Sequence, residues 1–161
     1  TISIANVMQT IPSLAMLAIL MFAIGTGPNT VVFAVFLYAI LPILKNTVSG
    51  INSVTPELID AATGMGMTKK QLMTKVELPL AISIIMGGIR NALVLAIGVT
   101  AVGTFIGAGG LGDIITRGIT VANGSPIIIA GAIPTALMAV LADLVLGTIE
   151  NKLTPRTFTK I

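Results

Sequence analysis

The sequence predicts an all-α, polytopic membrane protein that forms a single domain over residues 1–161. Hydrophobic residues make up 55% of the chain and charged residues only 9%, whereas soluble domains contain about 25% charged residues. Residues 1–44 carry no charged side chain, and two further uncharged runs cover residues 91–112 and 118–142. Each run is long enough to cross a bilayer, which takes roughly 20 helical residues. A soluble fold would need more charged surface than nine basic and six acidic residues supply.

Four membrane spans are predicted in this sequence. They cover about residues 7–24, 30–45, 79–104 and 125–147. Pro42 lies inside the second span and Pro134 inside the fourth, where neighbouring helices are expected to satisfy the freed backbone groups. The 17 glycines are expected to let the helices approach one another closely, as small residues do in membranes.

A polar, lysine-bearing segment, residues 55–77, separates the second span from the third. It begins with a pattern typical of a short helix, which Gly64 and Gly66 are expected to end. Thr68 and Gln71 have the spacing of a capping box, which opens a second helix. The sequence therefore predicts two short helices joined at a glycine corner and exposed between two membrane spans.

Basic residues are concentrated on one side of the predicted membrane. Seven basic residues lie on the side of the membrane that holds residues 55–77 and the C-terminus: Lys45, Lys69, Lys70, Lys75, Lys152, Arg156 and Lys160. Arg117 is the only basic residue on the other side. Because cytoplasmic loops are enriched in Lys and Arg, residues 55–77 and the C-terminus are expected in the cytoplasm. The net charge of +3 then reflects membrane topology, and no nucleic-acid partner is expected.

No catalytic, cofactor-binding or metal site is expected in this chain. It contains no His and no Cys, which are the commonest general bases, nucleophiles and transition-metal ligands. It also lacks the GxxxxGK[ST] loop that cradles nucleotide phosphates. The six carboxylates are scattered, without the spacing of an acid–base pair.

Two charged residues, Arg90 and Asp143, are predicted at membrane depth. Arg90 lies about 16 Å along the third span from Pro79, and Asp143 about 12 Å before Asn151, at the rise of a helix. Charges inside a membrane are costly and usually face a partner or a wet cavity. We therefore expect Arg90 to pair with Asp143 or with a polar group of a neighbouring span, either as a structural contact or as part of a solute path.

Residues 60–79 resemble the EAA signature of ABC-importer permeases, which runs Glu-Ala-Ala, three residues, Gly, nine residues, Ile, any residue, Leu-Pro. The matching positions are Asp60, Ala61, Ala62, Gly66, Val76, Leu78 and Pro79. Asp replaces Glu and Val replaces Ile, both exchanges of similar chemistry. The resemblance implies the transmembrane domain of a type I ABC importer, with this segment as the coupling helix. The methionines beside the glycine corner suit an adaptable apolar socket, so the residues expected to contact the ATPase are Asp60, Ala61, Ala62, Met65, Gly66, Met67, Leu78 and Pro79.

The same resemblance implies the partners and the location. ATP and Mg²⁺ would bind in separate cytoplasmic ATPase subunits, and a second permease subunit, identical or homologous, would complete the membrane part. An extracellular or periplasmic binding protein would deliver the solute, and lipid would surround the spans in the bacterial cytoplasmic membrane. Small permeases of this kind commonly have five spans, so one span is expected before residue 1.

A second resemblance concerns the solute. The stretch Phe105-Ile106-Gly107-Ala108-Gly109-Gly110-Leu111-Gly112-Asp113 is similar to the glycine-rich loop of osmoprotectant permeases, which import glycine betaine, carnitine and choline. Residues 37–47 resemble the same subfamily. The residues expected to line the solute path or to gate it are Phe105, Gly109, Gly110, Arg90 and Asp143. Two alternatives remain at this point: a permease of the same architecture for methionine or another small solute, and an ATP-independent channel or membrane scaffold.

Overall fold

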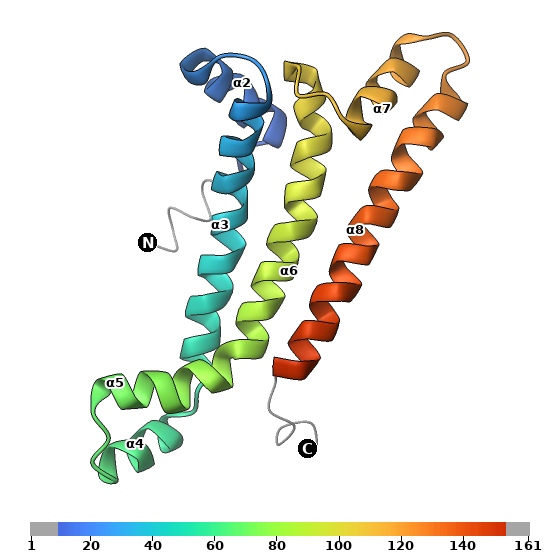
Figure 1. Ribbon diagram of the computed structural model, residues 1–161. Helices are drawn as coiled ribbons and strands as arrows, with labels where there is room; N and C mark the ends of the chain where they lie inside the picture. The colour runs from blue at the N-terminus through green and yellow to red at the C-terminus, as the bar shows by residue number, and fades with distance from the viewer. Residues whose placement is uncertain (1–9, 154–161) are drawn as a thin grey trace.

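The computed structural model describes residues 10–153, and all regular secondary structure within them is helical (Figure 1). Three long helices dominate: α3 (Pro28–Asn52), α6 (Leu78–Val102) and α8 (Ser125–Leu153). Their lengths of 25, 25 and 29 residues correspond to roughly 37–44 Å, more than the ~30 Å hydrocarbon core. All three are also apolar enough to cross a membrane.

The long helices extend beyond the predicted spans at the end that carries residues 55–77. The second span was predicted to end at Lys45, but α3 continues to Asn52. Its polar side chains bond to carbonyls of the preceding turn: Asn46 Nδ2 donates to Pro42 at 2.8 Å, and Thr47 Oγ1 donates to Ile43 at 2.7 Å. The helix therefore continues past the apolar stretch because these residues are compatible with its hydrogen-bond pattern.

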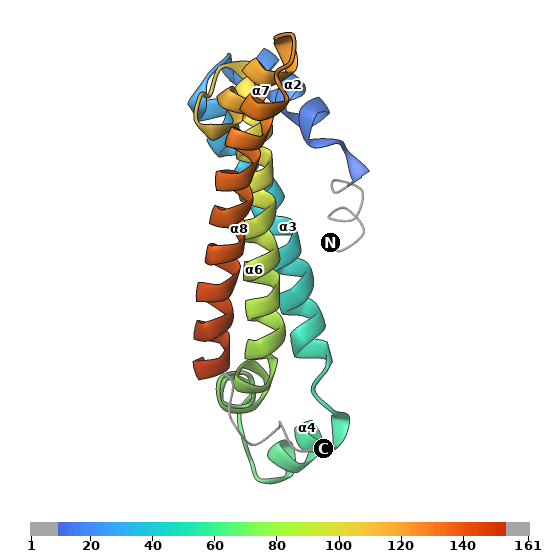
Figure 2. The same ribbon diagram turned by 90° about the vertical axis from the view of Figure 1, so that its right-hand side faces the viewer.

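The three long helices lie side by side in roughly one layer, with α6 between α3 and α8 (Figures 1 and 2). Glycines bring α3 and α6 into close contact. A Cβ atom on Gly88 would lie 2.6 Å from Asn46 Cβ, and one on Gly50 would lie 3.2 Å from Ala81 Cβ. This seam is the close helix packing expected from small residues in a membrane.

In place of one uninterrupted first span, residues 10–24 contain the 12-residue helix α2 (Ser13–Ile24). At about 18 Å, this helix is too short to cross the hydrocarbon core. Pro12 precedes it, and the Tyr38 hydroxyl donates to the Ile11 carbonyl at 2.5 Å. The helix lies across one end of α3, where Leu17 is fully buried. Residues 7–9 of the predicted span lie outside the described residues.

The short elements gather at the two ends of the layer (Figure 1). One end carries α4 (Pro56–Gly64), α5 (Lys69–Leu72) and a π-helical turn, η1 (Met73–Glu77). The other end carries α2, the 3₁₀ turn η2 (Gly103–Ile106) and α7 (Leu111–Thr120). Helix α8 contacts α6 and α7, yet Gly131 is its only buried residue. Most of its apolar surface is therefore open to lipid or to another membrane chain.

Candidate functional site

The predicted coupling segment folds as two short helices joined at a glycine corner. Helix α4 ends at Gly64, and the chain turns at Gly66, whose φ of +79° is left-handed. The Gly66 and Met67 amides donate to the Thr63 and Ala62 carbonyls at 2.9 and 3.2 Å. A Cβ atom on Gly66 would meet nothing within 4 Å, so the backbone conformation, and not space, favours glycine here.

The second half of the segment begins with the predicted capping box. Gln71 N donates to Thr68 Oγ1 at 3.3 Å, and Thr68 N donates to Gln71 Oε1 at 2.9 Å. The π-turn η1 then leads directly into α6, so that the helical path is continuous from Lys69 to Ile106. π-Turns often occur at functional sites, and no pattern in the sequence predicted this one. The segment is thus joined to α6 without a flexible linker.

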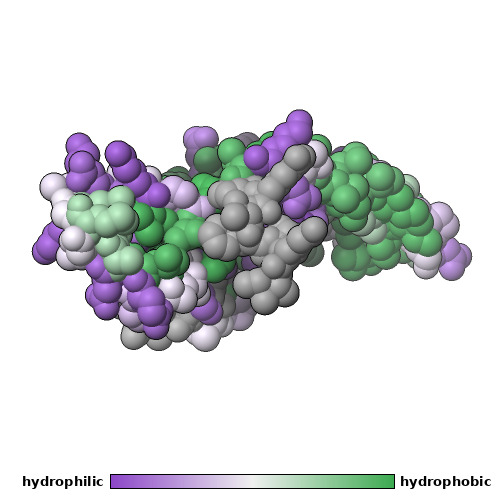
Figure 3. Space-filling view, turned by 90° about the horizontal axis from the view of Figure 1, so that it is seen from below, coloured by the Kyte–Doolittle hydropathy of each residue, from purple (hydrophilic) through white to green (hydrophobic). Residues whose placement is uncertain are grey.

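The residues predicted to couple fall into two groups. Around the corner, Asp60, Ala61 and Met65 are exposed. Ala62, in contrast, is the buried residue of α4 and is only 2% exposed. Seen from this end, hydrophilic residues surround a smaller hydrophobic area (Figure 3). Leu58 and Met65 are large hydrophobic residues of this part of the chain, 45% and 72% exposed. Of the remaining predicted residues, Gly66 and Met67 complete the corner, and Leu78 and Pro79 lie at the start of α6.

Arg90 joins α6 to two carboxylates of α8. Its Nε and Nη2 atoms donate to Asp143 Oδ1 and Oδ2, both at 2.8 Å, and Nη1 donates to Glu150 Oε2 at 2.9 Å. Ser83 Oγ donates to Glu150 Oε1 at 3.2 Å. The guanidinium is therefore held bidentately by one carboxylate and singly by another, in the geometry that Arg favours. The predicted contact between Arg90 and Asp143 is present.

Glu150 is a part of this network that the sequence analysis did not identify. It lies seven residues, two helical turns, after Asp143 on the same face of α8. Between them lies Gly147, where a Cβ atom would be 3.4 Å from the Arg90 Cζ atom. The guanidinium therefore lies directly against this turn of α8, within reach of both carboxylates.

The glycine-rich loop lies at the opposite end of the layer from the coupling segment. Phe105 is 59% exposed in η2, and Gly107, Gly109 and Gly110 have φ values of +83°, +72° and +87°. The Gly27 amide donates to the Ile106 carbonyl at 2.9 Å, which joins this loop to the turn between α2 and α3. A small cavity of about 80 Å³ lies behind the loop, with Gly109 and Gly110 in its wall.

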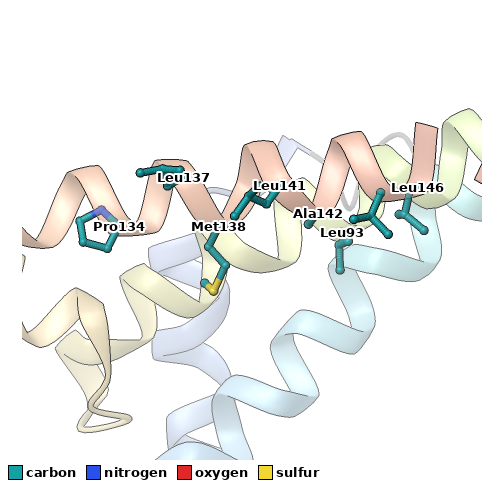
Figure 4. Close-up of a pocket in the computed structure, with 8 residues that line it drawn as sticks. Leu93, Pro134, Leu137, Met138, Leu141, Ala142 and Leu146 are labelled. Atoms are coloured by element: carbon teal, nitrogen blue, oxygen red, sulfur yellow. The ribbon is translucent and has the colours of Figure 1, made fainter. Parts of the chain in front are cut away.

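The predicted path residues are not brought into one site. Phe105 lies fifteen residues beyond Arg90 along the continuous helical path, roughly 22 Å away at the rise of a helix. A larger open groove of about 660 Å³ runs between α6 and α8 and has only apolar walls (Figure 4). Leu93 of α6 faces Pro134, Leu137, Met138, Leu141, Ala142 and Leu146 of α8 across it, together with Val145. This groove has no group that would hold a polar solute.

Long apolar helices in one layer, a structured polar corner at one end and an intramembrane ion network define a polytopic membrane protein of the transport type. The fold is similar to that of a chain of the MetNI methionine ABC transporter in an inward-facing conformation, with a TM-score of 0.83 and 21% identity. That match covers 95% of this chain and 74% of the other.

Residues 3–155 match the model of the family described as binding-protein-dependent transport system inner membrane component, and the chain belongs to this family. It is 62% identical to the carnitine transport permease protein OpuCD of Listeria monocytogenes, over 96% of this chain and 69% of the relative. It is 60% identical to the glycine betaine/carnitine/choline transport system permease protein OpuCD of Bacillus subtilis, over 95% and 67%. The predicted resemblance to ABC-importer permeases is confirmed.

Proposed function

We propose that this chain forms the solute path of an ABC importer for quaternary-amine osmoprotectants: glycine betaine, carnitine and choline. The observation that carries the proposal is its identity of about three residues in five with two permeases named for these solutes. The ion network is compatible with such cargo. It sets two carboxylates against one guanidinium, and the excess formal negative charge favours a cationic group nearby.

The corner around Gly66 is the proposed contact with a separate ATPase subunit, in which ATP and Mg²⁺ would bind. Three features support this role: the corner projects from the layer, Met65 beside Gly66 is 72% exposed, and the helical path from Lys69 to Ile106 is continuous. A displacement of α5 by the ATPase would therefore be transmitted to α6. In this proposal the chain couples solute movement to the ATPase, and the ATPase subunit hydrolyses ATP.

The proposed orientation places the corner and the end of α8 in the cytoplasm, because the basic residues lie there. The opposite end, with α7 and the glycine-rich loop, would meet an extracellular or periplasmic binding protein. A second permease subunit is required because one layer of helices has two open faces and cannot enclose a path. The membrane would be the bacterial cytoplasmic membrane.

The substrate is tested in cells that lack their own osmoprotectant uptake. The chain is expressed with its ATPase, second permease subunit and binding protein, and the cells are grown at high osmolarity with each solute in turn. Growth should be restored by at least one of glycine betaine, carnitine and choline. Uptake of methionine in place of these solutes would agree with the assigned fold but would overturn the proposed substrate class.

The coupling contact is tested by cross-linking. The chain has no cysteine of its own, so Met65→Cys provides a single thiol at the corner. Cysteines are introduced one at a time into the cleft of the ATPase, and we expect Met65→Cys to form a disulfide with at least one of them. Phe105→Cys, at the other end of the layer, should form none. A corner thiol that never cross-links to the ATPase would contradict the assignment.

A further inference from the structure

Asn91 is a polar residue at membrane depth that belongs neither to the ion network nor to the contacts between helices. It lies one residue beyond the midpoint of α6, which covers Leu78–Val102. Its side chain is exposed and forms no hydrogen bond to any of residues 10–153. An amide without a partner is unfavourable in hydrocarbon. Polar residues at this depth usually face a wet cavity or the interior of a bundle.

Two sides of α6 are covered by neighbouring helices. On one side, Gly88 meets Asn46 of α3, and Ala81 meets Gly50 of the same helix. On the other side, Ser83 and Arg90 bond to carboxylates of α8. Because α6 lies between α3 and α8 in one layer, two further sides of α6 remain, one on each face of the layer.

These two uncovered sides differ in chemistry. One carries Ile82, Ile85 and Ile89 and, toward its far end, Thr100, whose hydroxyl donates to the Ala96 carbonyl at 2.7 Å. This largely aliphatic surface is the kind expected against lipid or another apolar helix. The other side carries Gly87, Asn91 and Gly98, together with Leu95, which lies one turn beyond Asn91 and is 43% exposed. At about 100° per residue, Asn91 and Ile89 point roughly 160° apart. The polar residue is therefore confined to one face of the layer, although both residues lie at nearly the same depth.

The Asn91 side has two features of a path wall. Cβ atoms on Gly87 and Gly98 would meet nothing within 4 Å, so the surface beside the amide is low and open. The row Ser83, Gly87, Asn91 follows the i, i+4 spacing of one helix face, and Ser83 bonds to Glu150 of the ion network. The row thus leads from the network to Asn91, and the next residue at this spacing is the exposed Leu95.

We propose that Asn91 lines the solute path at the middle of the membrane, with Gly87 and Gly98 below and above it on the same side of α6. The inference rests on the proposed transport function and adds a residue that contacts the solute. A side-chain amide donates to the carboxylate of glycine betaine or carnitine, and it both donates to and accepts from the hydroxyl of choline. The isoleucine side faces lipid or a subunit contact.

Cysteine accessibility tests this assignment, because the chain contains no cysteine to remove. Asn91→Cys and Gly98→Cys would be treated with a membrane-impermeant methanethiosulfonate in the complete complex, with Ile89→Cys as the matched control. Only a thiolate in contact with water reacts, so we expect labelling at positions 91 and 98 to be about tenfold faster than at 89. Saturating solute should slow labelling at position 91.

The outcomes separate this inference from the transport function itself. If the unsubstituted complex transports solute and position 91 labels no faster than position 89, the path assignment is overturned while the function stands. Equal labelling of all three positions would also overturn it. Should Asn91→Cys fail to assemble, fast labelling at position 98 that solute slows would support the assignment, and slow labelling there would contradict it.

Discussion

Arg90 illustrates how a single side chain can join two membrane helices. It contacts Asp143 through two nitrogens and Glu150 through a third, each at 2.8–2.9 Å. The network is only partly enclosed, with the Arg90 side chain 31% exposed. At the depth predicted for it, its surroundings are lipid, protein or the solute path. The guanidinium therefore provides the counter-charge that both carboxylates need within the membrane.

Replacing Arg90 with Gln should impair assembly, because Asp143 and Glu150 would then lie close together without a counter-charge. We expect a melting temperature several degrees lower for the detergent-solubilised complex and a loss of ATP-dependent uptake. The matched control neutralises all three groups, as Arg90→Gln with Asp143→Asn and Glu150→Gln, and should regain much of the lost stability. Normal assembly and normal transport of Arg90→Gln would refute the account of the network.

The sequence predicted this contact in part. Counting residues along two antiparallel spans placed Arg90 and Asp143 at similar depth, because the rise of a helix is fixed. The role of Glu150 did not follow from depth, since it lies two turns closer to the end of α8. A long, flexible Arg side chain reaches both positions. A search for acidic residues seven apart on one helix face would have found it.

At the scale of elements, the packing of α3 on α6 depends on which glycine faces the seam. A Cβ atom on Gly88 would lie 2.6 Å from Asn46 Cβ and 2.9 Å from the Pro42 carbonyl oxygen, whereas one on Gly87 would meet nothing within 4 Å. Gly88→Ala should therefore destabilise the fold by about 1–3 kcal/mol through overpacking. Gly87→Ala should raise stability slightly through helix propensity.

The two variants are compared by thermal unfolding in detergent. The account requires Gly88→Ala to melt well below the unsubstituted protein and Gly87→Ala to melt at or above it. Equal melting temperatures for the two variants would show that α3 and α6 do not meet at this seam.

The glycine corner should be sensitive to backbone conformation. Gly66 has a φ of +79°, which Val adopts only with strain and Asn tolerates better. In the reconstituted complex, Gly66→Val should retain ATP hydrolysis but lose most solute uptake, so that the ratio of solute moved to ATP hydrolysed falls. Gly66→Asn should restore part of that ratio. An unchanged ratio in Gly66→Val would count against a coupling role for the corner.

Elements with strong local signals were the ones that the sequence predicted well. The capping box of Thr68 and Gln71 is present because both partners lie within one turn of helix. The long spans follow from uninterrupted apolar runs. Helix α2 begins later than the expected first span because hydropathy does not register Pro12, which directly precedes the helix. The π-turn η1 has no known sequence signature, so only the structure reveals it.

At the scale of the whole molecule, the polar chemistry of the membrane region is distributed unevenly. On α6, one side carries Asn91 with Gly87, Gly98 and Leu95, whereas the opposite side carries Ile82, Ile85 and Ile89. Predicted path residues at the glycine loop and at the ion network lie about 22 Å apart along the helix. A solute path through this chain would therefore need a continuous wall that connects the glycine loop with the ion network. A single binding site would not span this distance.

ATP-dependent uptake in proteoliposomes tests the central claim most directly. The chain would be reconstituted with its ATPase, second permease subunit and binding protein, and offered labelled glycine betaine, carnitine, choline and methionine with and without ATP. The account predicts uptake of at least one quaternary amine that requires both ATP and the binding protein. Uptake of methionine alone, or flux that is independent of ATP, would contradict it.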